Sequence, residues 1–161
     1  MGSGPFIAME LVEGESLGEL LEREGGGSLP VEQVLELTND LCVALDYAHK
    51  EGVVHRDVKL ENVMLTSEGV LKLMDFGLAK ALANPKGQTK MGVAMGTPGF
   101  MAPELVDRAN TADERADIFS LGCILYVMVG GRIAFSGANV LEALKSTTEG
   151  RYTPLLELAP D

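Results

Sequence analysis

Two motifs lie close together in this chain, and they constrain its fold more than any other feature. The first runs from His55 to Asn62 (His-Arg-Asp-Val-Lys-Leu-Glu-Asn), and the second is Asp75-Phe76-Gly77. Between them, Val63 to Leu65 and Val70 to Leu73 are rich in β-favouring side chains and bracket the turn sequence Ser67-Glu68-Gly69. This pattern predicts a short β-hairpin. The hairpin would place both motifs on neighbouring loops, so the fold must bring their polar side chains together.

Helical patterns surround this hairpin on both sides. Capping-box sequences begin at Ser16 and at Thr111, each with a glutamate three residues later, and predict two helix starts. Pro30 suits the first turn of a long helix that keeps apolar spacing up to Gly52. Further elements are expected at Phe6 to Val12 (a strand), Ile118 to Gly131 (a buried helix) and Asn139 to Gly150 (an amphipathic helix). The predicted fold class is therefore α+β, mainly α-helical, with short β-hairpins around one loop cluster.

Length and charge narrow the classes of protein. The 161 residues are 46% apolar, which indicates one domain with a substantial core. The formal net charge of −11 argues against a nucleic-acid partner, because phosphate backbones attract basic surfaces. That charge leaves two interpretations open: solvated helix faces, such as the one carrying Glu19 and Glu22, or a preference for basic peptides.

Two further features bear on location and redox state. The most apolar stretch, Ile118 to Gly131, is too short to span a bilayer, and no signal peptide is visible. We therefore expect no membrane segment and a cytoplasmic location. Cys42 and Cys123 both fall on apolar helical spacings, so we expect buried, reduced thiols rather than a disulfide or a zinc site.

The polar residues of the two motifs indicate a chemistry. Asp57, Lys59, Asn62 and Asp75 supply a base, a cation and two metal-binding oxygens, the set that phosphoryl transfer from a magnesium-bound nucleotide requires. A third motif, Gly-Thr-Pro-Gly-Phe-Met-Ala-Pro-Glu at residues 96–104, follows downstream. On these three motifs the chain resembles the larger, C-terminal lobe of a serine/threonine protein kinase of bacterial type, from the hinge strand onward.

The resemblance implies ATP as the phosphate donor and Mg²⁺ as its metal ion, with a protein or peptide as the acceptor. Asp57 would accept or orient the proton of the substrate hydroxyl, and Lys59 would neutralise charge on the transferred group. Asn62 and Asp75 match the two protein ligands of Mg²⁺. The adenine would pair with the backbones of Glu10 and Val12 and lie on Met64.

The resemblance also assigns residues around this centre. Thr97 and Glu104 match the peptide-docking end of the activation segment, and Thr97 points to Ser/Thr specificity, although a plain turn hydroxyl is the other interpretation. Arg56 would pair with a phosphate on the activation loop, for which Thr89 is the candidate besides Thr97. Structural support is expected from three residues: Asp117, which would bind the backbone of the catalytic loop, and His55 and Phe76, which would pack in the core.

Parts of a complete kinase are not found in these 161 residues: the Gly-rich loop, the strand lysine and its glutamate partner. Residues 1–161 are therefore expected to be a partial kinase domain, the hinge and C-lobe, without the N-lobe and the last C-lobe helices. We expect negligible transferase activity from the chain alone, and a Glu104 carboxylate left without its buried arginine partner. The alternative is a catalytically inactive, kinase-like module that binds proteins.

Overall fold

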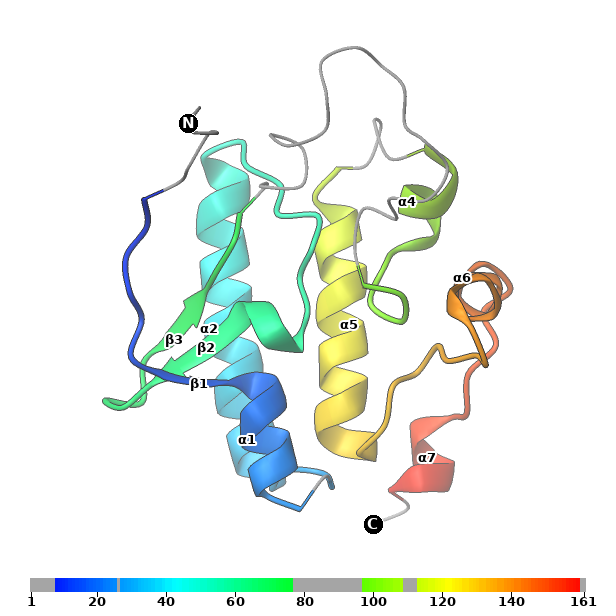
Figure 1. Ribbon diagram of the computed structural model, residues 1–161, viewed down its shortest axis with the longest axis horizontal. Coiled ribbons are helices and arrows are strands. Elements are labelled where there is room, and N and C mark those ends of the chain that lie inside the picture. Colours follow the sequence, from blue (N-terminus) through cyan, green and yellow to red (C-terminus); the bar gives the residue numbers. More distant parts are fainter. Residues whose placement is uncertain (1–7, 26, 77–96, 109–112, 160–161) are drawn as a thin grey trace, which may run out of the picture.

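A computed structural model describes residues 8–25, 27–76, 97–108 and 113–159 of the chain (Figure 1). Two long helices, α2 (Val31–Lys50) and α5 (Arg115–Gly130), run side by side through the molecule. A small sheet and helix α1 (Leu17–Arg23) lie on the α2 side, and α4 (Pro103–Arg108), α6 (Val140–Thr148) and α7 (Leu155–Leu158) lie on the α5 side. The mainly helical α+β character predicted from the sequence is present in these residues.

The sheet has three antiparallel strands in the order β1 (Gly14–Ser16), β2 (Val63–Thr66) and β3 (Leu71–Leu73). Strands β2 and β3 form the hairpin predicted between the two motifs, and the 3-10 helix η1 (Leu60–Asn62) leads into it. The predicted strand from Phe6 to Val12 is wrong for its described part, because residues 8–12 are in no strand. The strand that pairs with β2 begins at Gly14 instead. A Cβ at Gly14 would lie 2.1 Å from the Leu65 carbonyl oxygen, so only glycine permits this approach.

The hydrophobic core lies between α1, α2, α5 and the sheet. Fully buried side chains from all four regions meet there, among them Leu17, Leu41, Val63 and Ile124. Helix α5 is apolar almost all round and buries most of its residues, but Ile118 and Gly122 are exposed. Cys123 is buried on this helix, but Cys42 is exposed on α2, so the prediction that both thiols are buried is wrong for Cys42.

Helix α2 buries one narrow stripe, which explains the error at Cys42. Its buried residues keep a spacing of three or four: Val34, Leu37, Leu41, Leu45 and Ala48. The other apolar residues of α2, such as Leu35 and Val43, are exposed. Across the described ranges, no helix combines the length and apolarity that crossing a membrane requires.

Helix ends agree with the sequence at two of the three predicted caps. Ser16 caps α1 through a complete capping box with Glu19, and the Asn139 side chain accepts from the Glu142 amide at the start of α6. The third cap differs: α5 begins at Arg115, and its N-cap residue Glu114 makes no side-chain capping hydrogen bond. The Asp113 carboxylate accepts from the Arg115 amide at 3.1 Å instead. Thr111, the expected cap residue, lies outside the described residues. At its other end α5 stops at Gly131, which has the left-handed φ of 69° that suits glycine.

Candidate active site

The loop between α2 and η1, which we call the catalytic loop (residues 55–59), is held by one buried carboxylate. Asp117, in the first turn of α5, is 1% exposed. Its Oδ2 accepts from the His55 amide at 2.8 Å and its Oδ1 from the Arg56 amide at 2.7 Å. A buried carboxylate is stable only when hydrogen bonds replace its hydration. The contact expected of Asp117 is thus present in the structure.

A third donor to Asp117 was missed by the sequence analysis, which gave His49 no role beyond packing at a helix end. His49 lies in the last turn of α2, and its Nε2 is 2.8 Å from Asp117 Oδ2. An ionised carboxylate can only accept, so Nε2 carries the proton in this contact. The pair joins the ends of α2 and α5 directly beside the catalytic loop. The sequence gives one signal for this contact: His49 lies six residues before the His-Arg-Asp motif, at the end of a predicted helix.

His55 connects the catalytic loop to the second motif. Its Nε2 is 2.7 Å from the Met74 carbonyl oxygen, and its Nδ1 accepts from the Asp57 amide at 3.2 Å. A carbonyl oxygen can only accept, so the proton lies on Nε2 and Nδ1 is the acceptor. The side chain is 1% exposed. His55 is therefore packed and hydrogen-bonded as expected, and it ties residue 74 to the loop that carries Asp57.

The side chains of Lys59 and Asn62 both approach the Asp57 carboxylate. Lys59 Nζ lies 3.2 Å from Asp57 Oδ2, and both side chains are about a quarter exposed. Asn62 Nδ2 donates to the Asp57 carbonyl oxygen at 2.8 Å and lies 3.3 Å from Asp57 Oδ2. The carboxylate is thereby oriented by one cation and one amide while it stays accessible to solvent.

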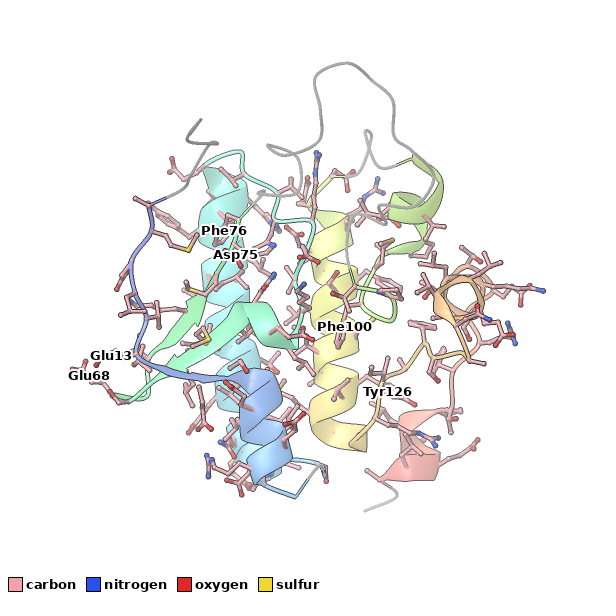
Figure 2. All side chains as sticks on the ribbon, viewed as in Figure 1. Glu13, Glu68, Asp75, Phe76, Phe100 and Tyr126 are labelled. Carbon is pink, nitrogen blue, oxygen red and sulfur yellow. The ribbon has the colours of Figure 1, made fainter. Side chains whose placement is uncertain are left out.

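Asp75 and Phe76 follow β3 and lie side by side in Figure 2. The Met74 amide donates to the Asn62 carbonyl oxygen at 2.7 Å, which brings Asp75 next to the asparagine of the first motif. Asp75 is exposed. Phe76 packs on the His55 ring with the centroids 4.6 Å apart, but it is 36% exposed, so the expectation that it lies in the core is only half met.

Two residues of this site have backbone conformations that non-glycine residues rarely adopt. Arg56 has φ 66° and Asp75 has φ 62°, both left-handed. Such conformations cost on the order of 1 kcal/mol or more each and cluster at functional sites. They are the only non-glycine residues with positive φ in the described part of the chain, and each belongs to one of the two motifs.

The donor set fits a magnesium ion. Asn62 uses its Nδ2 for Asp57, so the carbonyl oxygen Oδ1 points away from those contacts, and Asp75 adds an exposed carboxylate nearby. Within the described ranges, no group of three or more His, Cys, Asp or Glu side chains could enclose a metal ion. Magnesium suits such a site, because it commonly takes one or two protein oxygens and completes its shell with water and phosphate oxygens.

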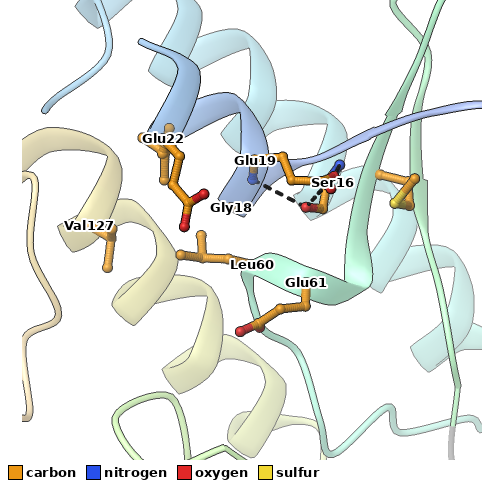
Figure 3. A pocket seen from close by; sticks show the side chains of 9 residues that line it. Ser16, Gly18, Glu19, Glu22, Leu60, Glu61 and Val127 are labelled. Carbon is orange, nitrogen blue, oxygen red and sulfur yellow. Dashed lines mark hydrogen bonds between the residues drawn. The ribbon is translucent and has the colours of Figure 1, made fainter. Parts of the chain in front are cut away.

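The residues predicted to bind adenine lie along one edge of the site. Glu10 and Val12 are on the extended segment before β1, and the Glu10 carboxylate forms an ion pair with Lys72 of β3. Met64 is half-buried on β2 and lines a groove of about 650 Å³ between α1, η1 and α5 (Figure 3). This groove adjoins the catalytic loop. Its lining combines apolar side chains with three carboxylates: Ser16, Gly18, Glu19, Leu21, Glu22, Leu60, Glu61, Met64 and Val127.

The expected substrate-docking segment is described from Thr97 onward. Thr97 is half-buried, and its carbonyl oxygen accepts from the Phe100 amide at 3.2 Å. Glu104 lies in the first turn of α4 and is exposed. Water therefore solvates the Glu104 carboxylate, and the loss of its arginine partner stays a prediction. Thr89, the other candidate for phosphorylation, lies outside the described residues.

Comparison with known proteins agrees with this geometry. The family model for the protein kinase domain matches residues 3–156. The serine/threonine-protein kinase PknB of Mycobacterium leprae (strain TN) is 38% identical over 190 residues, which cover 99% of this chain and 30% of that protein. The serine/threonine-protein kinase PknL of Mycobacterium tuberculosis (strain CDC 1551 / Oshkosh) is 40% identical over 140 residues, which cover 87% of this chain and 34% of PknL.

The chain therefore belongs to the protein kinase family, and these relatives are serine/threonine kinases of bacteria. The resemblance predicted from the three motifs is confirmed. The chain spans about a third of the length of these two relatives.

Proposed function

We propose that this chain is the hinge and C-lobe of a serine/threonine protein kinase, which transfers the γ-phosphate of ATP to Ser or Thr hydroxyls of proteins. The observation that carries the proposal is the convergence of Lys59 and Asn62 on the Asp57 carboxylate, with Asp75 held next to Asn62. A domain that only bound proteins would have no need of this arrangement.

Three polar side chains of the first motif have a task in this reaction. Asp57 orients the substrate hydroxyl and takes its proton, for which a carboxylate within hydrogen-bond reach of the attacking oxygen suffices. Lys59 and Asn62 both contact Oδ2, so we assign Oδ1 to the substrate hydroxyl. Lys59 also sits where its charge would stabilise the transferred group.

Asn62 Oδ1 and the Asp75 carboxylate would hold Mg²⁺. The ion, when bound, neutralises charge on the phosphates and fixes their orientation. Three further residues would support the site without touching substrate or ion. Asp117, His49 and His55 fix the backbone that carries Asp57 and Asp75. The backbones of Glu10 and Val12 and the side chain of Met64 are proposed for the adenine.

Thermal unfolding of the chain with and without Mg-ATP tests the proposal. We expect a cooperative transition whose midpoint rises with Mg-ATP, because a ligand that binds only the folded state stabilises it. Asp75→Asn is the matched control, since it removes one metal-binding carboxylate oxygen at nearly constant size, and its midpoint should not respond. A midpoint of the natural chain that ignores Mg-ATP would favour the protein-binding alternative.

A further inference from the structure

Helix α5 contacts two separate parts of the site through polar side chains one turn apart. Asp117 holds the catalytic loop, and Ser120, three residues later on the same face, reaches the segment after Thr97. The Ser120 hydroxyl donates to the Phe100 carbonyl oxygen at 2.7 Å. Figure 2 shows Phe100 beside α5. A single rigid helix therefore sets the spacing between these two segments.

The Ser120 hydroxyl has two acceptors within hydrogen-bond distance, one in its own helix and one outside it. Serine is a poorer helix former than alanine, and inside helices its hydroxyl commonly bonds back to the carbonyl four residues earlier. Here that carbonyl, of Ala116, is 3.0 Å away, farther than the carbonyl of Phe100. Ser120 is 4% exposed, so its hydroxyl must find a partner inside the protein. The carbonyl of Phe100 is the closer partner.

The segment that Ser120 reaches is a closed turn, residues 97–100, which we call the docking turn. The Phe100 amide donates to the Thr97 carbonyl oxygen at 3.2 Å, and the Phe100 ring is buried. Gly99 has φ 97°, and a Cβ there would lie 2.7 Å from Ile133 Cγ2 and 3.0 Å from the Phe135 carbonyl oxygen. The turn is thus packed against the segment after α5 on one side and hydrogen-bonded to α5 on the other.

We propose that Ser120 is a positioning residue for the protein substrate: its hydrogen bond to Phe100 fixes the docking turn relative to Asp57. This inference rests on the proposed kinase function. Because Ser120 acts on the docking turn and not on the residues assigned to ATP or Mg²⁺, its loss should weaken the use of protein substrate and leave nucleotide binding intact.

The test uses the longest natural polypeptide that contains these residues, with ATP and myelin basic protein as the probe substrate. Ser120→Ala should raise KM for the protein substrate about tenfold, as expected for the loss of one buried hydrogen bond. The kcat and the KM for ATP should stay within about twofold of the unsubstituted enzyme. An unchanged KM for the protein substrate, or equal effects on the KM values of protein and ATP, would overturn the proposal.

Ser146→Ala is the matched control. Ser146 is buried on α6, and its hydroxyl donates to the Arg151 carbonyl oxygen at 3.1 Å, so the same atom is removed from a hydrogen bond that does not involve the docking turn. Its KM values should not change. If it raises the KM for the protein substrate as Ser120→Ala does, general loosening of the fold explains the effect and the proposal fails.

Hydrogen exchange on the chain alone separates this inference from the proposed function. Ser120→Ala should speed exchange of the Phe100 amide about tenfold, because the docking turn opens more often once one hydrogen bond is lost. Ser146→Ala should not affect that amide. Unchanged exchange in Ser120→Ala overturns the positioning role even if the kinase is active, whereas absent kinase activity in the unsubstituted polypeptide overturns the proposed function.

Discussion

Asp117 shows how much of this site rests on one side chain. It accepts hydrogen bonds from two backbone amides and from His49 while fully buried. The family resemblance predicted its contact with the catalytic loop. The contact with His49 was missed, because the two residues are 68 positions apart and the spacing of His49 from the His-Arg-Asp motif does not name a partner.

Replacing Asp117 by Asn should lower the free energy of unfolding by about 3 kcal/mol, because an amide group turns one acceptor into a donor that faces other donors. Urea denaturation measures the change. Asp46→Asn is the control: Asp46 forms an exposed ion pair with Lys50 on α2, and its loss should cost less than about 0.5 kcal/mol. Equal losses in the two variants would contradict the role given to Asp117.

The two cysteines should differ sharply in reactivity. Burial raises the pKa of the Cys123 thiol to about 12, whereas Cys42 is exposed on α2. The thiolate is the reactive form, so at pH 8 iodoacetamide should label Cys42 at least about a hundredfold faster than Cys123 in the folded chain. Mass spectrometry of timed samples measures both rates. Cys42→Ser should abolish the fast labelling, and its persistence in that variant would mean that Cys123 is accessible.

At the scale of elements, capping and hairpin signals worked because they are local. The box at Ser16, the cap at Asn139 and the hairpin after Asn62 each depend on residues only a few positions apart. The strand predicted from Phe6 to Val12 is absent from its described part, residues 8–12, because pairing depends on how closely β2 can be approached. Gly14 permits that approach. The run of apolar side chains before Gly14 does not determine which residues pair with β2.

The capping box of α1 predicts a pH-dependent stability. Hydrogen bonds from the Ser16 backbone amide and hydroxyl lower the pKa of Glu19 below its ordinary value. A lowered pKa means that the folded state favours the ionised form, so this stabilisation is present at neutral pH. It is lost as the pH falls through the folded-state pKa, which lies below the ordinary pKa of a glutamate.

Glu19→Gln should therefore be less stable than the natural chain at pH 7 and nearly equal to it once the pH lies below the folded-state pKa of Glu19. Urea denaturation at both pH values measures the difference. Glu22→Gln, on the same helix but outside the capping box, serves as the control and should show no such pH dependence. A deficit in Glu19→Gln that persists at the lower pH would show that the carboxylate charge is not what stabilises the helix start.

At the scale of the whole molecule, the order of helices and the loop cluster were predictable, but the buried face of α2 was not. Apolar residues occupy more than one side of this helix, and only the position of α5 and the sheet decides which of them are covered. The convergence of Asp57, Lys59 and Asn62 was expected from the family motif, but its detail, with both contacts on Oδ2, required the structure.

The chain alone should transfer phosphate negligibly. These 161 residues contain no Gly-x-Gly-x-x-Gly loop and no counterpart of the lysine of the kinase N-lobe. The inner phosphates would therefore have neither a loop covering them nor a cation from an N-lobe. Incorporation of labelled phosphate from Mg-ATP into the chain and into myelin basic protein measures this. Incorporation that Asp57→Asn abolishes would contradict the expectation and show that the chain suffices for catalysis.

The left-handed backbone conformations of Arg56 and Asp75 bear on how these positions should vary in evolution. Glycine would occupy either conformation without strain, so random drift in a lineage released from catalysis should replace both residues and gain stability in doing so. A lineage that still performs the proposed reaction should tolerate the strain at Asp75, because the proposed Mg²⁺ site needs its carboxylate. Across a wide sampling of descendants, Asp75 should therefore be lost together with Asp57 or kept together with it.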